Sequence, residues 1–66
     1  MKLDHVVRWT LTPESPNYME PDCPQTDLCR DASGEVQYWD EETAIAEAMH
    51  MQDKTIRVSY TMEHRP

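Results

Sequence analysis

The side chains with the clearest chemical potential in this chain are two cysteines and three histidines. Cys23 and Cys29 enclose five residues in the stretch CPQTDLC. Structural zinc sites favour about two to four residues between paired cysteines, and two further ligands would have to come from His5, His50 or His64. The spacing therefore disfavours zinc. Free thiols, the default in a reducing compartment, and a disulfide across the turn both remain open.

Other catalytic patterns are weak. The carboxylates of Asp22 and Asp27 lie next to the cysteines and should raise the pKa of the two thiols, which suppresses their reactivity. Glu47 and His50 stand three positions apart, as in some carboxylate and histidine metal motifs, but no second such pair accompanies them. The single glycine, Gly34, excludes a glycine-rich loop that cradles phosphate. We expect neither an enzyme nor a bound metal or cofactor.

The elements that would position any site follow from the spacing of apolar residues. Residues 2–12 alternate between two faces, and this period of two predicts a strand. Residues 13–34 contain four prolines and no sustained periodicity, which predicts a stiff acidic loop. We expect two more strands at residues 35–39 and 55–62, with a helix at residues 40–52 between them.

The predicted helix has a clear beginning. Asp40 suits the N-cap position, and Glu41 and Glu42 fall in the first turn, where the helix dipole stabilises each carboxylate by about 0.3–1 kcal/mol. The stripe expected to pack on a sheet consists of Ala44, Ile45, Ala48, Met49 and Gln52. Because the stripe is rich in small residues, the helix can lie close to the sheet.

These segments predict one α+β domain in the order strand, long loop, strand, helix, strand. We expect a three-stranded sheet with the helix on one face and the first strand antiparallel and central. A chain of 66 residues buries only about 60% of the surface that its unfolded form exposes, so the core should be thin.

The charge of the chain is strongly negative and unevenly placed. It has 13 acidic and 6 basic side chains and a formal net charge of −7. Residues 14–47 hold ten acids and one base, so this segment carries −9. Such a protein repels nucleic acid and is attracted to basic surfaces. No apolar run approaches the roughly 20 residues of a membrane span, and Asp4, His5 and Arg8 interrupt any secretion signal, so we expect a cytoplasmic protein.

Helix capping and solubility account for some of these acids but not for those in the loop. DNA carries one negative charge per about 1.7 Å of its axis, and DNA-binding proteins meet it with basic grooves. A stiff loop lying beside a helix N-terminus could spread carboxylates over one face and occupy such a groove. The candidate partner-binding residues are Glu20, Asp22, Asp27, Asp31, Glu35, Asp40, Glu41, Glu42 and Glu47, with Tyr18 and Trp39 as aromatic anchors or core residues.

In its small size, its strong negative charge and its lack of a catalytic motif, the chain resembles the small anti-CRISPR proteins of bacteriophages and other mobile elements. Several of those proteins resemble DNA in charge layout and block the site where a CRISPR surveillance complex reads its target. The resemblance concerns the character of all 66 residues and no motif, so it transfers no site residues. It implies a basic DNA-binding subunit of a type I complex as partner, in the cytoplasm of a bacterial host.

A second hypothesis is a structural or assembly role. The strand predicted at residues 55–62 could form an exposed sheet edge and add to another sheet, either in an accessory subunit of a phage or in a homodimer. Salt separates the two hypotheses, because charge pairing weakens as salt rises and strand addition does not.

Overall fold

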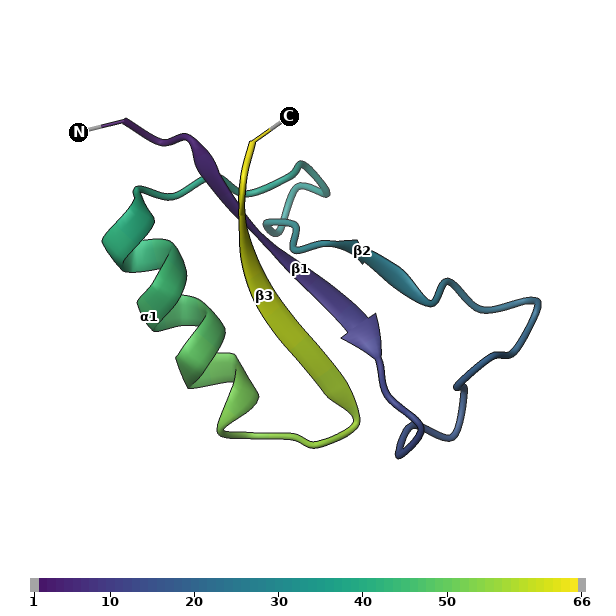
Figure 1. The fold of residues 1–66 in the computed structure, drawn as a ribbon. Coiled ribbons are helices and arrows are strands. Elements are labelled where there is room, and N and C mark those ends of the chain that lie inside the picture. The colour runs from purple at the N-terminus through teal and green to yellow at the C-terminus, as the bar shows by residue number, and fades with distance from the viewer. Residues whose placement is uncertain (1, 66) are drawn as a thin grey trace.

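The chain folds into a three-stranded antiparallel sheet with one helix packed against it (Figure 1). The computed structural model describes residues 2–65. In chain order the elements are β1 (His5–Leu11), β2 (Thr26–Leu28), α1 (Glu41–Gln52) and β3 (Val58–His64). The strand order β2-β1-β3 confirms the α+β class and the central, antiparallel place of the first strand. In the described part of the chain, no helix is long and apolar enough to cross a membrane.

The longest ladder joins all of β1 to all of β3, with Leu11 opposite Val58 at one end. Strand β3 begins later than the predicted segment 55–62. Ile56 lies in the turn before it: its carbonyl accepts a hydrogen bond from the Thr12 hydroxyl at 2.7 Å, and its side chain is 74% exposed. The ladder starts at Val58, and before it only Thr12 bonds to Arg57 and Ile56, so the alternation alone placed the start of the strand too early.

The short strand β2 lies within residues 13–34, which the sequence predicted to be a loop. It pairs antiparallel with β1, with Trp9 opposite Asp27. The pairing extends by one bond beyond the strand, from the Cys29 N–H to the Val7 carbonyl at 2.8 Å. Three residues give too little alternation to reveal a strand in the sequence.

Residues 35–39 form no strand, contrary to the prediction. Because β2 already occupies this edge of β1, the segment reaches β1 itself at Trp39, while its Gln37 N–H donates to the carbonyl of Cys29 just after β2 at 3.0 Å. The N–H and the carbonyl of Trp39 pair with those of His5 at 2.9 Å. Earlier in the segment, Val36 makes an isolated bridge with Arg30, which closes a small turn.

A small core lies between the sheet and α1. Val7 of β1 is buried there with Ala44 and Ala48 of the helix. The helix therefore turns Ala44 and Ala48 to the sheet, whereas Ile45 and Met49, which were predicted to pack there, are 41% and 65% exposed. The smaller side chains let the helix approach larger residues that pack around them: Cys29, Trp39, Met51, Tyr60 and Met62.

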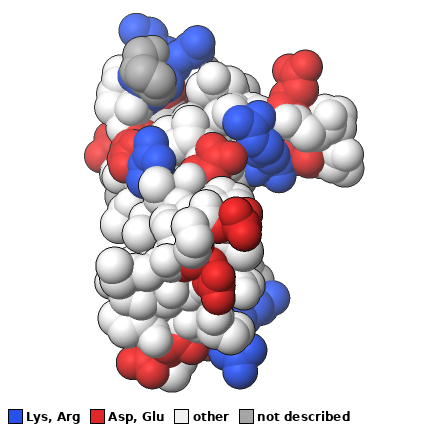
Figure 2. Space-filling model, turned by 90° about the vertical axis from the view of Figure 1, so that its right-hand side faces the viewer, with Lys and Arg blue, Asp and Glu red and all other residues white. Residues whose placement is uncertain are grey.

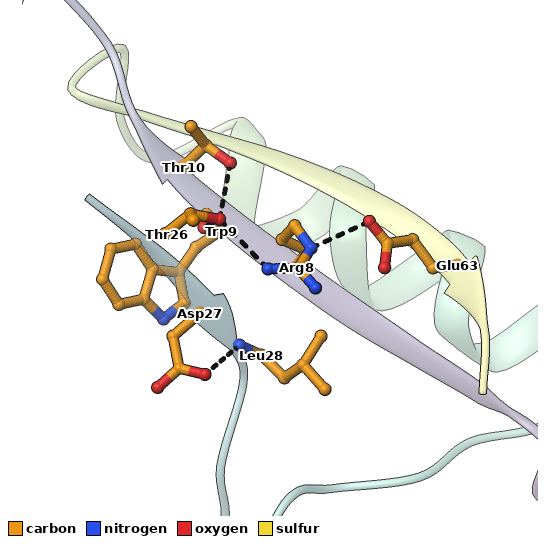
Figure 3. A network of polar contacts seen from close by, with 7 residues as sticks. All are labelled: Arg8, Trp9, Thr10, Thr26, Asp27, Leu28 and Glu63. Atoms are coloured by element: carbon orange, nitrogen blue, oxygen red, sulfur yellow. Dashed lines mark hydrogen bonds and ion pairs between the residues drawn. The ribbon is translucent and has the colours of Figure 1, made fainter. Parts of the chain in front are cut away.

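The face of the sheet opposite the helix carries a network of polar side chains (Figure 3). Arg8 of β1 donates from Nε to Glu63 of β3 at 2.9 Å and from Nη1 to the Thr26 hydroxyl of β2 at 3.3 Å. The Thr26 hydroxyl also lies 3.1 Å from that of Thr10 and donates to the Trp9 carbonyl at 2.9 Å. The network thus links all three strands by side-chain contacts.

Candidate partner-binding surface

Residues 12–25, here called the projecting loop, connect β1 to β2 on the side of the sheet away from α1 (Figure 1). The Gln25 side chain organises this loop. Its Oε1 accepts the Met19 N–H at 2.7 Å, and its Nε2 lies 3.0–3.2 Å from the carbonyls of Asn17, Glu20 and Cys23. One carboxamide therefore holds four backbone groups, so polar bonds and not burial fix the shape of the loop.

The projecting loop presents apolar and acidic side chains together. Met19 is 75% exposed and has a φ of 60°, in the left-handed region that non-glycine residues seldom adopt. Tyr18 beside it is 41% exposed. The side chains of Glu14, Glu20 and Asp22 are exposed as well. Three of the candidate residues, Tyr18, Glu20 and Asp22, thus lie on one short segment that no other element covers.

Asp27 lies at the base of this loop, in β2, and is already engaged. Its carboxylate is 3.6 Å from Nε of Arg30 and accepts the N–H of Leu28 at 2.7 Å. A local base therefore offsets its charge, which makes it the weakest of the acidic candidates.

Asp31 and Glu35 belong to the turn that follows β2. Asp31 Oδ1 accepts hydrogen bonds from the Ser33 hydroxyl at 2.6 Å and from the N–H groups of Ser33 and Glu35. The hydroxyl of Ser33, with these N–H groups, holds the pKa of Asp31 below its ordinary value. Asp31 therefore shapes the turn, while the Glu35 side chain stays exposed.

The remaining acidic candidates lie along α1. Asp40 precedes the helix in an extended conformation and makes no side-chain capping bond to the backbone, although the nearby Thr43 hydroxyl lowers the pKa of its carboxyl. Glu41 and Glu42 are exposed in the first turn, and Glu47 is half-buried one turn further on. The helix front, defined as residues 40–42, is therefore a compact acidic group.

The two aromatic candidates have different surroundings. Trp39 is half-buried and packs against the core, so most of its contacts are internal. Tyr18 belongs to the exposed loop described above. A third aromatic, Tyr38, is 38% exposed and holds the Arg65 guanidinium 4.7 Å from its ring centre.

The acidic candidates do not form one continuous field. The helix packs on β3 and β1, whereas the projecting loop leaves the sheet beside β2, so the helix front and the loop lie on opposite sides of the molecule (Figure 1). The expectation that the loop lies beside the helix N-terminus is therefore wrong. Figure 2 views the molecule from the right-hand side of Figure 1 and shows acidic side chains interspersed with basic ones.

Even so, few of these acids are neutralised. Among the ion pairs of residues 2–65, the pair between Asp27 and Arg30 is the one that reaches an acid of residues 14–47. The excess charge of that segment thus remains largely unpaired. Six of its ten acids form two separate acidic groups, three at the projecting loop and three at the helix front, and the other four, Asp27, Asp31, Glu35 and Glu47, lie outside both groups.

A further polar cluster lies at one end of the β1–β3 ladder, where His5 is opposite His64. Asp4 lies 2.8 Å from Nδ1 of His5 and 3.4 Å from Nε2 of His64, and the two imidazole rings meet edge to face at 5.2 Å. Partial burial tends to raise the pKa of Asp4, but the hydrogen bond from His5 and the two nearby imidazoles outweigh it and leave the pKa below its ordinary value. Within residues 2–65 no group of three histidine, cysteine or acidic side chains is arranged to hold a metal ion.

Two glutamines that fix backbone groups were not among the predicted functional residues. Gln25 organises the projecting loop, and Gln52 at the end of α1 binds β3. Gln52 Oε1 accepts the Tyr60 N–H at 2.9 Å, and its Nε2 donates to the Val58 carbonyl at 2.8 Å. No local pattern marks such a residue, because its partners depend on how distant segments meet.

Comparison with protein-family models, with curated proteins and with solved structures finds no match for this chain.

Proposed function

We propose that this chain is a non-enzymatic binding protein that occupies the basic, nucleic-acid-binding surface of another protein. The observation that carries the proposal is the set of unneutralised carboxylates on residues 14–47, against a single internal ion pair at Asp27. Carboxylates that lack internal cations raise the self-repulsion of the fold, and a basic partner relieves that repulsion.

The two acidic groups narrow the proposal. The helix front offers fixed carboxylates on a regular element, and the projecting loop offers carboxylates beside the exposed Tyr18 and Met19. An apolar side chain amid charge supplies the buried contact that holds a charged interface together. A partner groove would contact one group at its centre, and would reach the other only by wrapping around the narrow body.

The resemblance to anti-CRISPR proteins makes the proposal specific. It points to a DNA-reading subunit of a type I surveillance complex, in the cytoplasm of a bacterium that carries a phage or another mobile element. In this role the protein acts by competing with target DNA and transforms no substrate.

The test is a competition experiment with a purified type I surveillance complex and a fluorescent target duplex. We expect the chain to displace the duplex, and we expect the displacement to weaken steeply as salt rises, because charge pairs carry it. Displacement that does not change with salt, or no displacement by a folded protein across complexes of this type, contradicts the proposal.

Matched variants locate the contact. Replacing both Glu41 and Glu42 by glutamine tests the helix front. The control is Asp53→Lys, which raises the net charge by the same amount at the other end of the helix. Glu20→Gln with Asp22→Gln tests the projecting loop. We expect one of the two glutamine pairs to weaken displacement by at least about tenfold, equivalent to about 1.4 kcal/mol, while Asp53→Lys has a smaller effect. Equal effects of all three would show that only net charge matters.

A further inference from the structure

The outer edge of β3 has backbone groups that are only partly used. Along β3, residues whose backbone groups point towards β1 alternate with residues whose backbone groups point outward. The bonds from Gln52 to the Val58 carbonyl and the Tyr60 N–H show which residues point outward. The outward groups beyond Gln52 are the Tyr60 carbonyl, the N–H and carbonyl of Met62, and the N–H and carbonyl of His64, of which the first four can pair with a second strand. Within residues 2–65 these four groups make no hydrogen bond.

We propose that a second copy of this chain pairs with this edge in an antiparallel, two-fold arrangement that places Met62 opposite Met62 of the second copy. Each Met62 N–H then donates to the Met62 carbonyl of the other copy. Each His64 N–H donates to the Tyr60 carbonyl of the other copy. These four groups pair with each other across the two-fold axis. The His64 carbonyl stays unpaired, because the Tyr60 N–H opposite it remains bonded to Gln52, which keeps both of its bonds to β3.

Two side chains select this register over its neighbours. A shift of the second copy by two residues in one direction would require the Tyr60 N–H, which Gln52 already holds at 2.9 Å. A shift in the other direction would set Glu63 opposite Glu63 of the second copy, and like charges directly opposite each other destabilise a strand pair. In the proposed register Glu63 faces Thr61 of the second copy, and its own charge is met by Arg8 at 2.9 Å.

The helix supplies an apolar flank beside this edge. Ile45 and Met49 precede Gln52 by seven and three positions, so they lie on the side of α1 that Gln52 turns towards the free edge. Both are exposed, at 41% and 65%. The helix runs beside β3 (Figure 1), and within residues 2–65 its hydrogen bonds to the outward backbone groups of β3 come from Gln52 and reach Val58 and Tyr60, not Met62.

The negative net charges of the two copies repel each other, and this repulsion determines how salt changes the affinity of the dimer. Each copy carries −7, so salt that screens the repulsion should strengthen the dimer. This dependence has the opposite sign to the competition with DNA proposed above. The dimer uses Met62, Ile45 and Met49 and not the helix front or the projecting loop, so either proposal can fail without the other.

The first test is sedimentation equilibrium of the whole chain at rising protein and salt concentrations. We expect a monomer–dimer equilibrium that shifts towards dimer as salt rises. Met49→Glu, at the flank, should raise the dissociation constant by at least about tenfold. Ile56→Glu is the matched control, because Ile56 is 74% exposed in the turn before β3 and the change in charge is the same. A protein that stays monomeric at about millimolar concentration in about 1 M salt, where the Debye length is about 3 Å, overturns the proposal.

The second test locates the contact by amide hydrogen exchange in the unmodified protein. The amides of Met62 and His64 should exchange quickly in dilute monomer and slowly in concentrated dimer. The Tyr60 amide should be protected in both states, because Gln52 accepts its hydrogen bond. A dimer that protects residues of β2 instead, or that leaves Met62 and His64 unprotected, also overturns the proposal.

Discussion

The two sides of β1 are stabilised in different ways. On the β3 side a seven-residue ladder is covered by α1, and apolar side chains meet in the small core. On the β2 side three residues pair, and the rest of the region is held by the Gln25 carboxamide and by short turns. Among the described residues, three of the four buried hydrophobic residues, Val7, Ala44 and Ala48, lie between the sheet and α1, whereas side-chain hydrogen bonds order the projecting loop.

Gln52 and Gln25 are the same residue type, but one lies on the packed side of β1 and the other on the loop side. Gln52 binds an edge that the helix already positions, so its bonds add to a packed region. Gln25 binds a largely exposed loop, where its bonds add to a series of backbone turns between Thr12 and Cys23. The consequence of losing each one should therefore differ in extent.

The largest expected effect is on the packed side. Val7→Ala removes two methyl groups from a fully buried site beneath α1 and should lower the free energy of unfolding by about 2 kcal/mol. Leu28→Ala, in the half-buried strand β2, should cost less than half as much although it removes a larger group. Urea denaturation followed by circular dichroism measures both free energies of unfolding. Equal losses in the two variants would show that the β2 side of β1 is packed as tightly as the β3 side.

A smaller effect is expected from replacing the two glutamines, and it should differ between them. Gln52→Ala should lower the global free energy of unfolding by about 1 kcal/mol and speed exchange of the Tyr60 amide, because that N–H loses its acceptor. Gln25→Ala should change the global value less and should speed exchange of the Met19 amide. Hydrogen exchange by NMR checks both. A global loss from Gln25→Ala that matches Gln52→Ala would show that the loop and the core unfold together.

The smallest expected effect is a dependence on acid pH. The pKa values of Asp4 and Asp31 are lowered in the folded protein, so each carboxylate contributes stability above the ordinary value of 3.8, and the contribution is lost as pH falls through the folded pKa. Asp4 contacts imidazoles at the ends of both β1 and β3, whereas Asp31 contacts only its own turn. Asp4→Asn should therefore flatten the fall of melting temperature below this pH more than Asp31→Asn does. If melting temperature falls with pH in the same way in both variants, Asp4 does not stabilise the fold more than Asp31.

The sequence predicted the elements that have a long repeat. The alternation around Val7 identified β1, and the acids Glu41 and Glu42 marked the start of α1 within one residue of its observed beginning. Strand β2 was missed because three residues carry no usable period. Residues 35–39 were assigned to a strand because nothing in them shows that β2 already fills the edge of β1.

The candidate site was predictable in composition but not in arrangement. Exposure of Glu20, Asp22 and Glu41 follows from their charge, and the structure confirms it. Their distribution over two sides of the molecule depends on where the loop leaves the sheet, which is a tertiary property. The roles of Gln25 and Gln52 are of the same kind, since each binds backbone groups that only folding brings within reach.

The different settings of the two cysteines have a practical consequence. Burial, with the nearby charge of Asp27, raises the pKa of the Cys29 thiol, so an alkylating reagent should react with it slowly at neutral pH. Cys23 lies in the projecting loop, where its carbonyl binds Gln25. A fluorophore or spin label carried by a maleimide should therefore attach first at Cys23. This places a reporter next to Asp22 without any substitution in the chain.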